Sequence, residues 1–337
     1  MTRLSDYDYV LPEAAIAQKP IEPRDASKML VLNSGAISHS TFRELPVFLK
    51  SGDLIIANNT RVSAIRLSGS KATGGQVEAL LLREIGDGEY EAMLKPAKRL
   101  KFGAEIEFGG DLKAKVTRGH ESGIAEIKFE NGPDLKQKLA DAGTVPLPPY
   151  VHELLEDAGR YQTVYACADG SAAAPTAGLH FTETVLDALR EKGVDIAYIT
   201  LDVGIDTFRP LTSEDVSAHI MHGEKFVVPK ETAAKVSSAR GRILAVGTTA
   251  VRALETAAIG ERTVAPGAGC SSLFITPGYS FKIVDSMITN FHMPRTTMLL
   301  MVSALCGREN LKNAYLEALS KRYRFLSFGD CMLILGG

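Results

Sequence analysis

Three segments of the 337-residue chain place polar side chains beside the start of a predicted helix. The first, residues 174–181, is a loop of small residues that contains Thr176 and Gly178 and ends at His180. Thr182 then provides a helix cap, and apolar residues follow at helical spacing. Because the first N–H groups of a helix lack intrahelical partners and carry partial positive charge, this loop can receive an anionic or polar ligand.

The second segment, residues 242–249, reads as a buried strand that ends in a glycine and two hydroxyl residues, Thr248 and Thr249. A helix follows through residue 257, and its start is a plausible cradle for a phosphate or carboxylate. Arg252, one turn into that helix, can add a charged fork to the same pocket. The alternative is a plain strand-to-helix turn with a threonine cap.

The third segment, residues 285–294, places Asn290 and His292 where a predicted strand gives way to a loop. The carboxyl ends of strands are the usual position of site residues in α/β sheets. The alternative is that both side chains satisfy local backbone groups.

Two further polar clusters are weaker candidates. His219, His222 and Glu224 lie close together, and their irregular offsets are a poor metal signal but would suit general acid–base groups. The residues after the first predicted buried strand offer amide and guanidinium donors, or form a simple polar turn. They are Asn58, Asn59 and Arg61.

Overall charge does not indicate a nucleic-acid-binding protein, since 38 basic residues face 40 acidic ones. Local clusters could still contact phosphates, with an aromatic side chain stacked on a base, or could be solvated faces. One cluster comprises Lys95, Lys98, Arg99 and Lys101, and the other comprises Lys321, Arg322 and Arg324, with Tyr323 and Phe325 interleaved.

Composition places the chain among soluble globular proteins, with 45% hydrophobic residues and no signal peptide. The longest apolar run, residues 298–306, is too short to span a bilayer. Four widely spaced cysteines read as free thiols in a reducing cytoplasm. No Gly-x-Gly-x-x-Gly motif follows a predicted strand, so no dinucleotide-binding fold is indicated.

The predicted elements divide the chain into two domains. Residues 76–131 show short alternating runs separated by glycine-rich turns, typical of a small barrel or sandwich, and a short helix over 135–142 follows. Helices alternate with buried strands elsewhere. We therefore predict an α/β fold in which a discontinuous main domain, residues 1–65 and 150–337, carries an inserted β-barrel-like domain, residues 66–149.

Together these segments resemble one family closely, the S-adenosylmethionine:tRNA ribosyltransferase-isomerases of queuosine biosynthesis. The resemblance runs in order from residue 6 to the C-terminus. The matching strings are YDY (7–9), LP (11–12), NNTRV (58–62), LPPY (147–150), YQTVY (161–165), APTAGLHF (174–181), HIMHGE (219–224), AVGTTAVR (245–252), PGY (277–279), DSMITNFHMP (285–294), YRF (323–325) and GD (329–330).

The resemblance implies a specific reaction. The ribosyl moiety of S-adenosylmethionine would move onto 7-aminomethyl-7-deazaguanine at the tRNA wobble position, giving epoxyqueuosine-tRNA, adenine and methionine. S-adenosylmethionine would be consumed as a co-substrate, with no metal or other cofactor. The partner would be a tRNA with a G-U-N anticodon, and the enzyme would be cytoplasmic and monomeric, since no self-pairing surface is evident.

The reaction needs a base for the aminomethyl amine and a proton donor for adenine. We predict His180 and His292 for proton transfer, followed by His219, His222 and Glu224. Thr248, Thr249 and Arg252 are the predicted anion-binding residues. The remaining predicted substrate-binding residues are Asn58, Asn59, Arg61, Thr176, Gly178, Asn290 and Asp330, and the predicted tRNA-binding residues are Lys95, Lys98, Arg99, Lys101 and Arg324.

The chain departs from the family pattern at Asp202 and Asp206, where the family usually has His and Gly. Two extra carboxylates beside a site for RNA would weaken binding unless they are paired. One alternative is therefore a catalytically weakened paralogue that binds tRNA without turnover. The other is an enzyme that acts on a free deazaguanine, which the basic cluster at residues 95–101 disfavours.

The predicted proton-transfer roles are testable. Replacing His180 or His292 by Ala, with folding intact, is expected to lower the rate at least about a hundredfold. A near-wild-type rate in adenine release would exclude that histidine from proton transfer.

Overall fold

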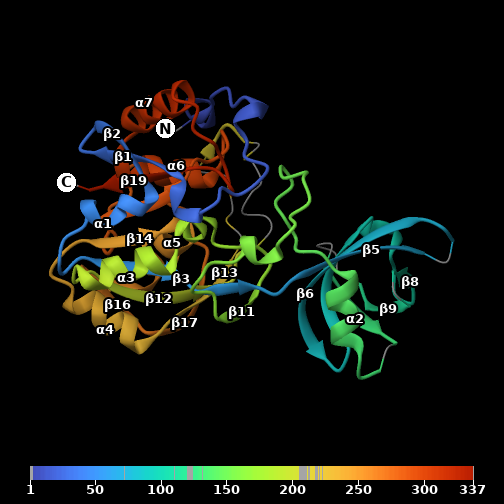
Figure 1. The fold of residues 1–337 in the computed structure, drawn as a ribbon. Coiled ribbons are helices and arrows are strands. Elements are labelled where there is room, and N and C mark those ends of the chain that lie inside the picture. The colour runs from blue at the N-terminus through green and yellow to red at the C-terminus, as the bar shows by residue number, and fades with distance from the viewer. Residues whose placement is uncertain are drawn as a thin grey trace. The chain divides into compact units, whose positions relative to one another are not determined.

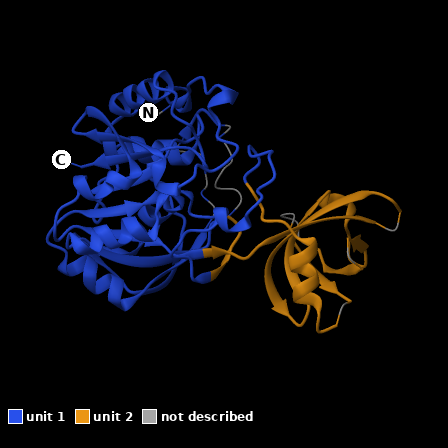
Figure 2. Cartoon of the chain, viewed as in Figure 1, with its two compact units in different colours: residues 1–60, 148–168, 174–337 blue, residues 61–147, 169–173 orange. Residues whose placement is uncertain are grey.

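The computed structural model describes residues 3–71, 73–109, 111–119, 124–130, 132–204, 211, 213–216, 219, 221 and 223–336. The chain forms two compact units (Figure 2). Unit 1 comprises residues 1–60, 148–168 and 174–337, and unit 2 comprises residues 61–147 and 169–173.

Unit 1 is built on a mixed sheet, in which nine strands pair within the described residues. The four central strands, β12, β3, β14 and β18, run parallel, and β19 pairs antiparallel to β18. Figure 1 shows β1 and β19, from opposite ends of the chain, side by side. In sheet order the strands are β17 (Gly267–Ser271), β13 (Glu224–Val228), β12 (Asp195–Leu201), β3 (Leu54–Asn58), β14 (Ile243–Val246), β18 (Ser286–Asn290), β19 (Cys331–Leu335), β1 (Lys28–Asn33) and β2 (Ala36–Thr41).

Strands β3, β14 and β18 are buried on both faces because helices cover both. Every residue of β3, β14 and β18 is buried. Helices α1 and α3 share one core cluster with alternate strand residues such as Ile55 and Val246, and α5 packs against the same strands from the other face. The α-helices are α1 (Leu45–Phe48), α2 (Leu135–Ala142), α3 (Glu183–Glu191), α4 (Lys230–Ser238), α5 (Gly247–Ala257), α6 (Thr297–Cys306) and α7 (Arg308–Ser320).

The predicted starts of the helices are confirmed. Thr182 caps α3, because its Oγ1 accepts from the Val185 amide, and Thr296 caps α6 through the Leu299 amide. Gly247 begins α5 with φ of +83°, a backbone conformation that glycine adopts without the penalty of a β carbon. The chain can therefore turn sharply from β14 into α5.

Unit 2 is a closed six-stranded barrel of antiparallel strands, so the predicted fold class is confirmed. Its inward-facing side chains form one apolar cluster, to which Leu135 and Leu139 of α2 contribute. The strands, in order around the barrel, are β10 (Ile124–Phe129), β7 (Glu89–Lys95), β6 (Gln76–Gly86), β5 (Ile65–Lys71), β8 (Glu105–Phe108) and β9 (Leu112–Arg118). Two short pairs complete the fold, β4 (Thr60–Val62) with β11 (Ala168–Ser171) and β15 (Ala258–Gly260) with β16 (Thr263–Val264).

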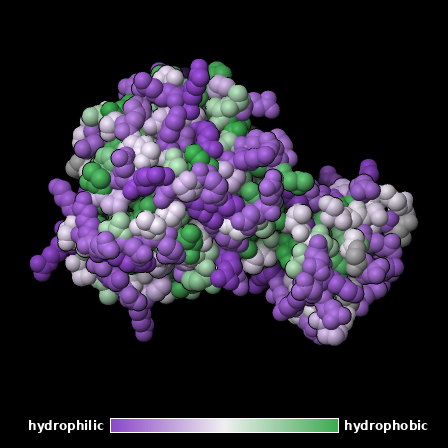
Figure 3. All heavy atoms as spheres, in the orientation of Figure 1, coloured by the Kyte–Doolittle hydropathy of each residue, from purple (hydrophilic) through white to green (hydrophobic). Residues whose placement is uncertain are grey.

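The face of the molecule in Figure 3 is mostly hydrophilic, with hydrophobic side chains scattered over it. Among the described residues, no helix has both the length and the apolar character needed to cross a membrane.

Asp53 fixes the amino ends of two neighbouring parallel strands, at the edge opposite their carboxyl ends. Its carboxylate accepts from the Lys50 amide at 2.9 Å, the Arg242 amide at 2.9 Å and the Arg242 guanidinium at 2.6 Å. Burial raises the pKa of Asp53, but the hydrogen bonds from Arg242 and the Lys50 amide outweigh it and lower the pKa below its usual range. The ion pair therefore stabilises the fold above the carboxyl's ordinary pKa, and this contribution is lost as the pH falls through the lowered pKa.

Replacing Asp53 by Asn is expected to lower the free energy of unfolding by about 2–3 kcal/mol at pH 7, because the Arg242 guanidinium and two backbone amides lose a buried, charged acceptor. Urea denaturation measures the change. Asp187→Asn is the matched control, since the Asp187 pair with Arg190 is 63% and 52% exposed and is expected to contribute less than about 0.5 kcal/mol. Equal effects at the two sites would contradict the assignment.

Candidate substrate pocket

The three predicted segments meet in one pocket of unit 1, at the carboxyl ends of the parallel strands. The pocket encloses about 590 Å³ of empty space, open solvent included. The loop before α3, the start of α5 and the end of β18 all line it. Its lining residues are Tyr150, Ala174, Pro175, Thr176, Ala177, Val203, Gly247, Thr248, Thr249, Thr289, Asn290, Phe291, His292, Met293, Met298, Leu326 and Ser327.

The start of α5 offers the pocket hydrogen-bond donors. Among the described residues no side chain caps this helix, so its first backbone N–H groups keep their capacity for a ligand. Thr248 and Thr249 are 8% and 7% exposed, and Thr249 Oγ1 is buried without a hydrogen-bond partner among the described residues. A buried hydroxyl without a partner is costly, which favours a polar ligand at this point.

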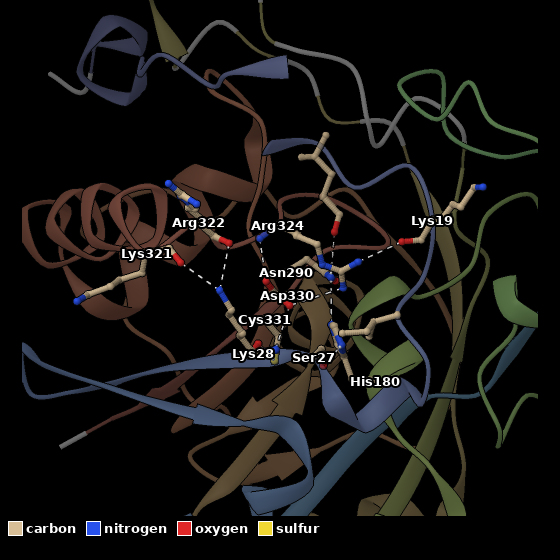
Figure 4. A network of polar contacts seen from close by, with 12 residues as sticks. Lys19, Ser27, Lys28, His180, Asn290, Lys321, Arg322, Arg324, Asp330 and Cys331 are labelled. Carbon is tan, nitrogen blue, oxygen red and sulfur yellow. Dashed lines mark hydrogen bonds and ion pairs between the residues drawn. The ribbon is translucent and has the colours of Figure 1, made fainter. Parts of the chain in front are cut away.

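Asn290, at the end of β18, is bound on three sides (Figure 4). Its Oδ1 accepts from Thr176 Oγ1 at 3.1 Å, and its Nδ2 donates to the Leu326 carbonyl at 3.2 Å. The same Nδ2 lies 3.2 Å from His180 Nε2, on the loop before α3. The amide is therefore held between segments that are distant in the sequence.

His180 lies behind Asn290 and does not line the pocket. It is 4% exposed, its Nδ1 lies 2.8 Å from Ser27 Oγ, and its ring packs on Phe42. Burial, together with the nearby positive charges of Arg324 and Arg24, lowers the pKa of His180 to about 3. The ring is therefore neutral at physiological pH.

His292 lines the pocket itself. Its Nε2 lies 2.7 Å from Thr289 Oγ1, and no described residue bonds its Nδ1. Its main chain is held by two tyrosines, because the His292 amide donates to Tyr315 Oη at 2.9 Å and Tyr9 Oη donates to the His292 carbonyl. Burial lowers the pKa of His292 to about 4, so this ring is also neutral at pH 7.

Glu224 and Arg252 lie beside a second, smaller cavity that Thr248, Thr249 and Met298 also line. Arg252 Nη1 binds Glu224 Oε2 at 2.5 Å, and Arg252 Nη2 donates to the Ser271 carbonyl at 3.0 Å. The Arg252 guanidinium, which was predicted to bind an anionic ligand, thus pairs with a carboxylate of the protein itself. His219 stacks edge-on against Phe274, and His222 lies outside the described residues.

Six predicted substrate-binding residues do not line this pocket. Arg252 lies beside the second cavity, Arg61 lies 3.7 Å from Asp169 in unit 2, and the other four have local structural roles. Asn58 bonds the Leu201 backbone, and Asn59 bonds Thr200 and Cys167. Asp330, 1% exposed, accepts from the Lys28 and Arg324 amides (Figure 4). Gly178 is required by close packing, because a β carbon there would lie 2.1 Å from Tyr165 Oη.

The predicted tRNA-binding residues differ in exposure and in whether an acidic side chain pairs with them. Lys95 belongs to unit 2, where it pairs with Glu78 at 3.4 Å. Arg324 in unit 1 is one-third exposed and donates to the Lys19 carbonyl. Within the described part of the chain, the exposed Lys98, Arg99 and Lys101 form no ion pair.

The aromatic residues interleaved with the second basic cluster are buried. Tyr323 is 3% exposed and Phe325 is fully buried, so neither offers a face for stacking on a base. The reason is packing, since both rings contact Phe291 at centroid distances of 5.7 and 4.7 Å.

Several pocket residues had no predicted site role. Tyr150 Oη hydrogen-bonds Ser327 Oγ at 2.6 Å across 177 positions of the chain, and both residues line the pocket. Burial raises the pKa of Tyr150 to about 12. Tyr150 lies in one of the matched strings, LPPY, and that match could have identified it as a site residue. No local sequence pattern marks Ser327. The described residues contain no group of three or more His, Cys, Asp or Glu that could hold a metal ion.

Comparison with known proteins gives consistent matches over nearly the whole chain. Residues 4–334 match the family model described as queuosine biosynthesis protein. A Symbiobacterium thermophilum protein named S-adenosylmethionine:tRNA ribosyltransferase-isomerase is 51% identical over 340 residues, covering 99% of this chain and all of the relative. A Moorella thermoacetica protein of the same name is 48% identical over 343 residues, covering 99% of this chain and all of that protein. The crystal structure of S-adenosylmethionine tRNA ribosyltransferase from Thermotoga maritima is similar at 36% identity, with a TM-score of 0.56, over 98% of this chain and all of that one.

The two buried imidazoles make stability depend on pH. An unfolded histidine binds a proton near pH 6.5, whereas folded His180 and His292 do so only near pH 3 and 4. Because the unfolded chain binds more protons below pH 6.5, the free energy of unfolding is expected to fall as the pH is lowered from 7 to 5.

Replacing His180 by Gln should make the decrease in the free energy of unfolding between pH 7 and pH 5 smaller by about 2 kcal/mol. The reason is that each histidine contributes up to about 1.4 kcal/mol per pH unit below 6.5. Urea denaturation at pH 7, 6 and 5 measures it, with His152→Gln, at an exposed position, as the control. An unchanged pH dependence in His180→Gln would show that His180 is not held neutral.

Proposed function

The chain belongs to the queuosine biosynthesis protein family, as its sequence resemblance predicted, and we propose that it moves the ribosyl moiety of S-adenosylmethionine onto 7-aminomethyl-7-deazaguanine at the tRNA wobble position. Members of this family use S-adenosylmethionine and tRNA as substrates. The proposed products are epoxyqueuosine-tRNA, adenine and methionine. The convergence of three segments of the matched sequence on one pocket is the observation that carries the proposal.

S-adenosylmethionine would bind in the pocket of unit 1. The uncapped start of α5 suits the methionyl carboxylate, because backbone N–H groups and the helix dipole both favour an anion there. Thr248 and Thr249 would add hydroxyl donors. Arg252 would act indirectly, since its guanidinium is committed to Glu224 and Ser271.

His292 is the stronger of the two candidates for proton transfer. The aminomethyl nitrogen must lose a proton as its bond to the ribosyl carbon forms, and the departing adenine must gain one. A neutral imidazole in the pocket can accept a proton, and the two tyrosines hold the backbone of His292 in place. His180 does not line the pocket, because Asn290 lies between its ring and the pocket.

Basic residues would bind the tRNA backbone. Lys98, Arg99 and Lys101 of the barrel keep exposed charges, and Arg324 adds a partly exposed charge in unit 1, two residues from the pocket residue Leu326. Exposed cations give affinity that falls steeply with salt, whatever the base sequence. The wobble-base chemistry would restrict the substrate to tRNAs with a G-U-N anticodon.

The release of adenine tests the proposal. Pure protein, S-adenosylmethionine and tRNA carrying the aminomethyl-deazaguanine base should yield adenine in proportion to modified tRNA. Unmodified tRNA of the same sequence is the control and should yield none, because it lacks the nucleophilic amine.

Two other outcomes would contradict the proposal. Salt-dependent tRNA binding without adenine release would indicate the binding-only paralogue and direct attention to Asp202 and to Asp206, which lies outside the described residues. Adenine release with the free deazaguanine alone, and no salt-dependent affinity for tRNA, would indicate an enzyme that does not act on RNA.

A further inference from the structure

The Leu326 carbonyl sets the direction of a hydrogen-bond chain in the pocket wall. A main-chain carbonyl can only accept, so the Asn290 atom 3.2 Å from it must be the amide nitrogen. The amide oxygen of Asn290 therefore points to Thr176, and Thr176 Oγ1 must donate to it. Once its single proton is used, the Thr176 hydroxyl can only accept from a ligand.

The side chains of Thr176 and Asn290 consequently offer the pocket acceptors only. Thr176 Oγ1 retains lone pairs, and Asn290 Oδ1 has one donor among the described residues and room for a second. Both side chains line the pocket. Such a wall suits an N–H donor, above all a cationic one, and disfavours a carboxylate.

The neighbouring wall offers donors. No described side chain caps the start of α5, and Thr249 Oγ1, in a residue that is 7% exposed, is buried without a described partner. The two walls are adjacent, since a β carbon on Gly247 would lie 3.4 Å from the Ala177 methyl group, next to Thr176. Acceptors and donors thus lie side by side, as the ammonium and carboxylate of an α-amino acid do.

We propose that Thr176 and Asn290 bind the α-ammonium of the methionyl group, so that this part of the pocket recognises an amino-acid zwitterion. The proposal rests on the proposed use of S-adenosylmethionine, and it adds the residues that recognise the amino end. His180 and Ser27 then act as positioning residues. His180 Nε2 accepts from Asn290, so its proton lies on Nδ1 and is donated to Ser27 Oγ.

A comparison of two substrates in three proteins tests the ammonium contact. The substrates are S-adenosylmethionine and its analogue in which hydrogen replaces the α-amino group, and kcat/KM for adenine release is measured with modified tRNA in excess. The wild type is expected to prefer S-adenosylmethionine by about tenfold or more, the usual effect of a charged hydrogen bond. Thr176→Val should lose most of that preference, and Thr176→Ser, which keeps the hydroxyl, should retain it.

The ratio of kcat/KM for the two substrates distinguishes loss of the ammonium contact from a general loss of activity. If Thr176→Val lowers kcat/KM equally for both substrates, Thr176 is structural and the proposal is wrong. If the variant instead raises KM for the modified tRNA and leaves the ratio intact, the wall binds the aminomethyl amine of the base. If the wild type releases no adenine at all, the proposed function fails before this question arises.

The direction of the hydrogen-bond chain has a readout independent of activity. In ¹⁵N-labelled protein, the His180 ring is expected to show a protonated Nδ1 and an unprotonated Nε2 at pH 7. Asn290→Asp removes the N–H donor that Nε2 accepts and places a carboxylate there, so the pKa of His180 should rise. A wild-type ring with its proton on Nε2 would overturn the assigned direction and the acceptor-only wall with it.

Discussion

The pocket depends on one buried amide, that of Asn290. It connects β18 to the loop before α3 through Thr176 and His180, and to the turn before β19 through Leu326. Through His180 the connection extends to Ser27, at the entry to β1. Each of these bonds joins segments that are distant in the sequence, and an unsatisfied buried amide would cost about 1–3 kcal/mol. The same contacts that hold these segments together therefore also define the chemistry of the pocket wall.

Neither histidine near this amide adds a positive charge to the pocket. Burial keeps both histidines neutral, so neither repels a sulfonium ion or an ammonium group. The guanidinium of Arg252, near the second cavity, is neutralised by Glu224 at 2.5 Å. What the pocket presents is instead a set of fixed dipoles, with acceptors on one wall and helix N–H groups on the other. Such preorganised dipoles orient a zwitterion without burying an unpaired charge.

Sequence patterns predicted the helices, strands and loops that line the pocket better than the hydrogen bonds that connect them. Local signals located the loop before α3, the start of α5 and the end of β18, because caps, a strand-ending glycine and strand burial are properties of neighbouring residues. The partners of Asn290 could not be predicted, since Leu326 is 36 positions away and His180 is 110. For the same reason Asn58 and Asp330 were predicted to bind substrate, although in the structure both bond backbone amides. The sequence around a polar residue at a strand end is similar whether its side chain binds a ligand or hydrogen-bonds the protein's own backbone.

The division of the chain into two units separates the two recognition problems that the proposed reaction poses. Every lining residue of the pocket belongs to unit 1, so under the proposed function side chains of a single unit would recognise the small substrate. The barrel has its own apolar core, and ion pairs neutralise many of its surface charges, such as Lys95 with Glu78 and Arg83 with Glu91. Its exposed residues Lys98, Arg99 and Lys101 form no ion pair among the described residues, and under the proposed function they would contact the phosphate backbone. Changes to that cluster can alter affinity for RNA without disturbing the buried amide on which the pocket is built.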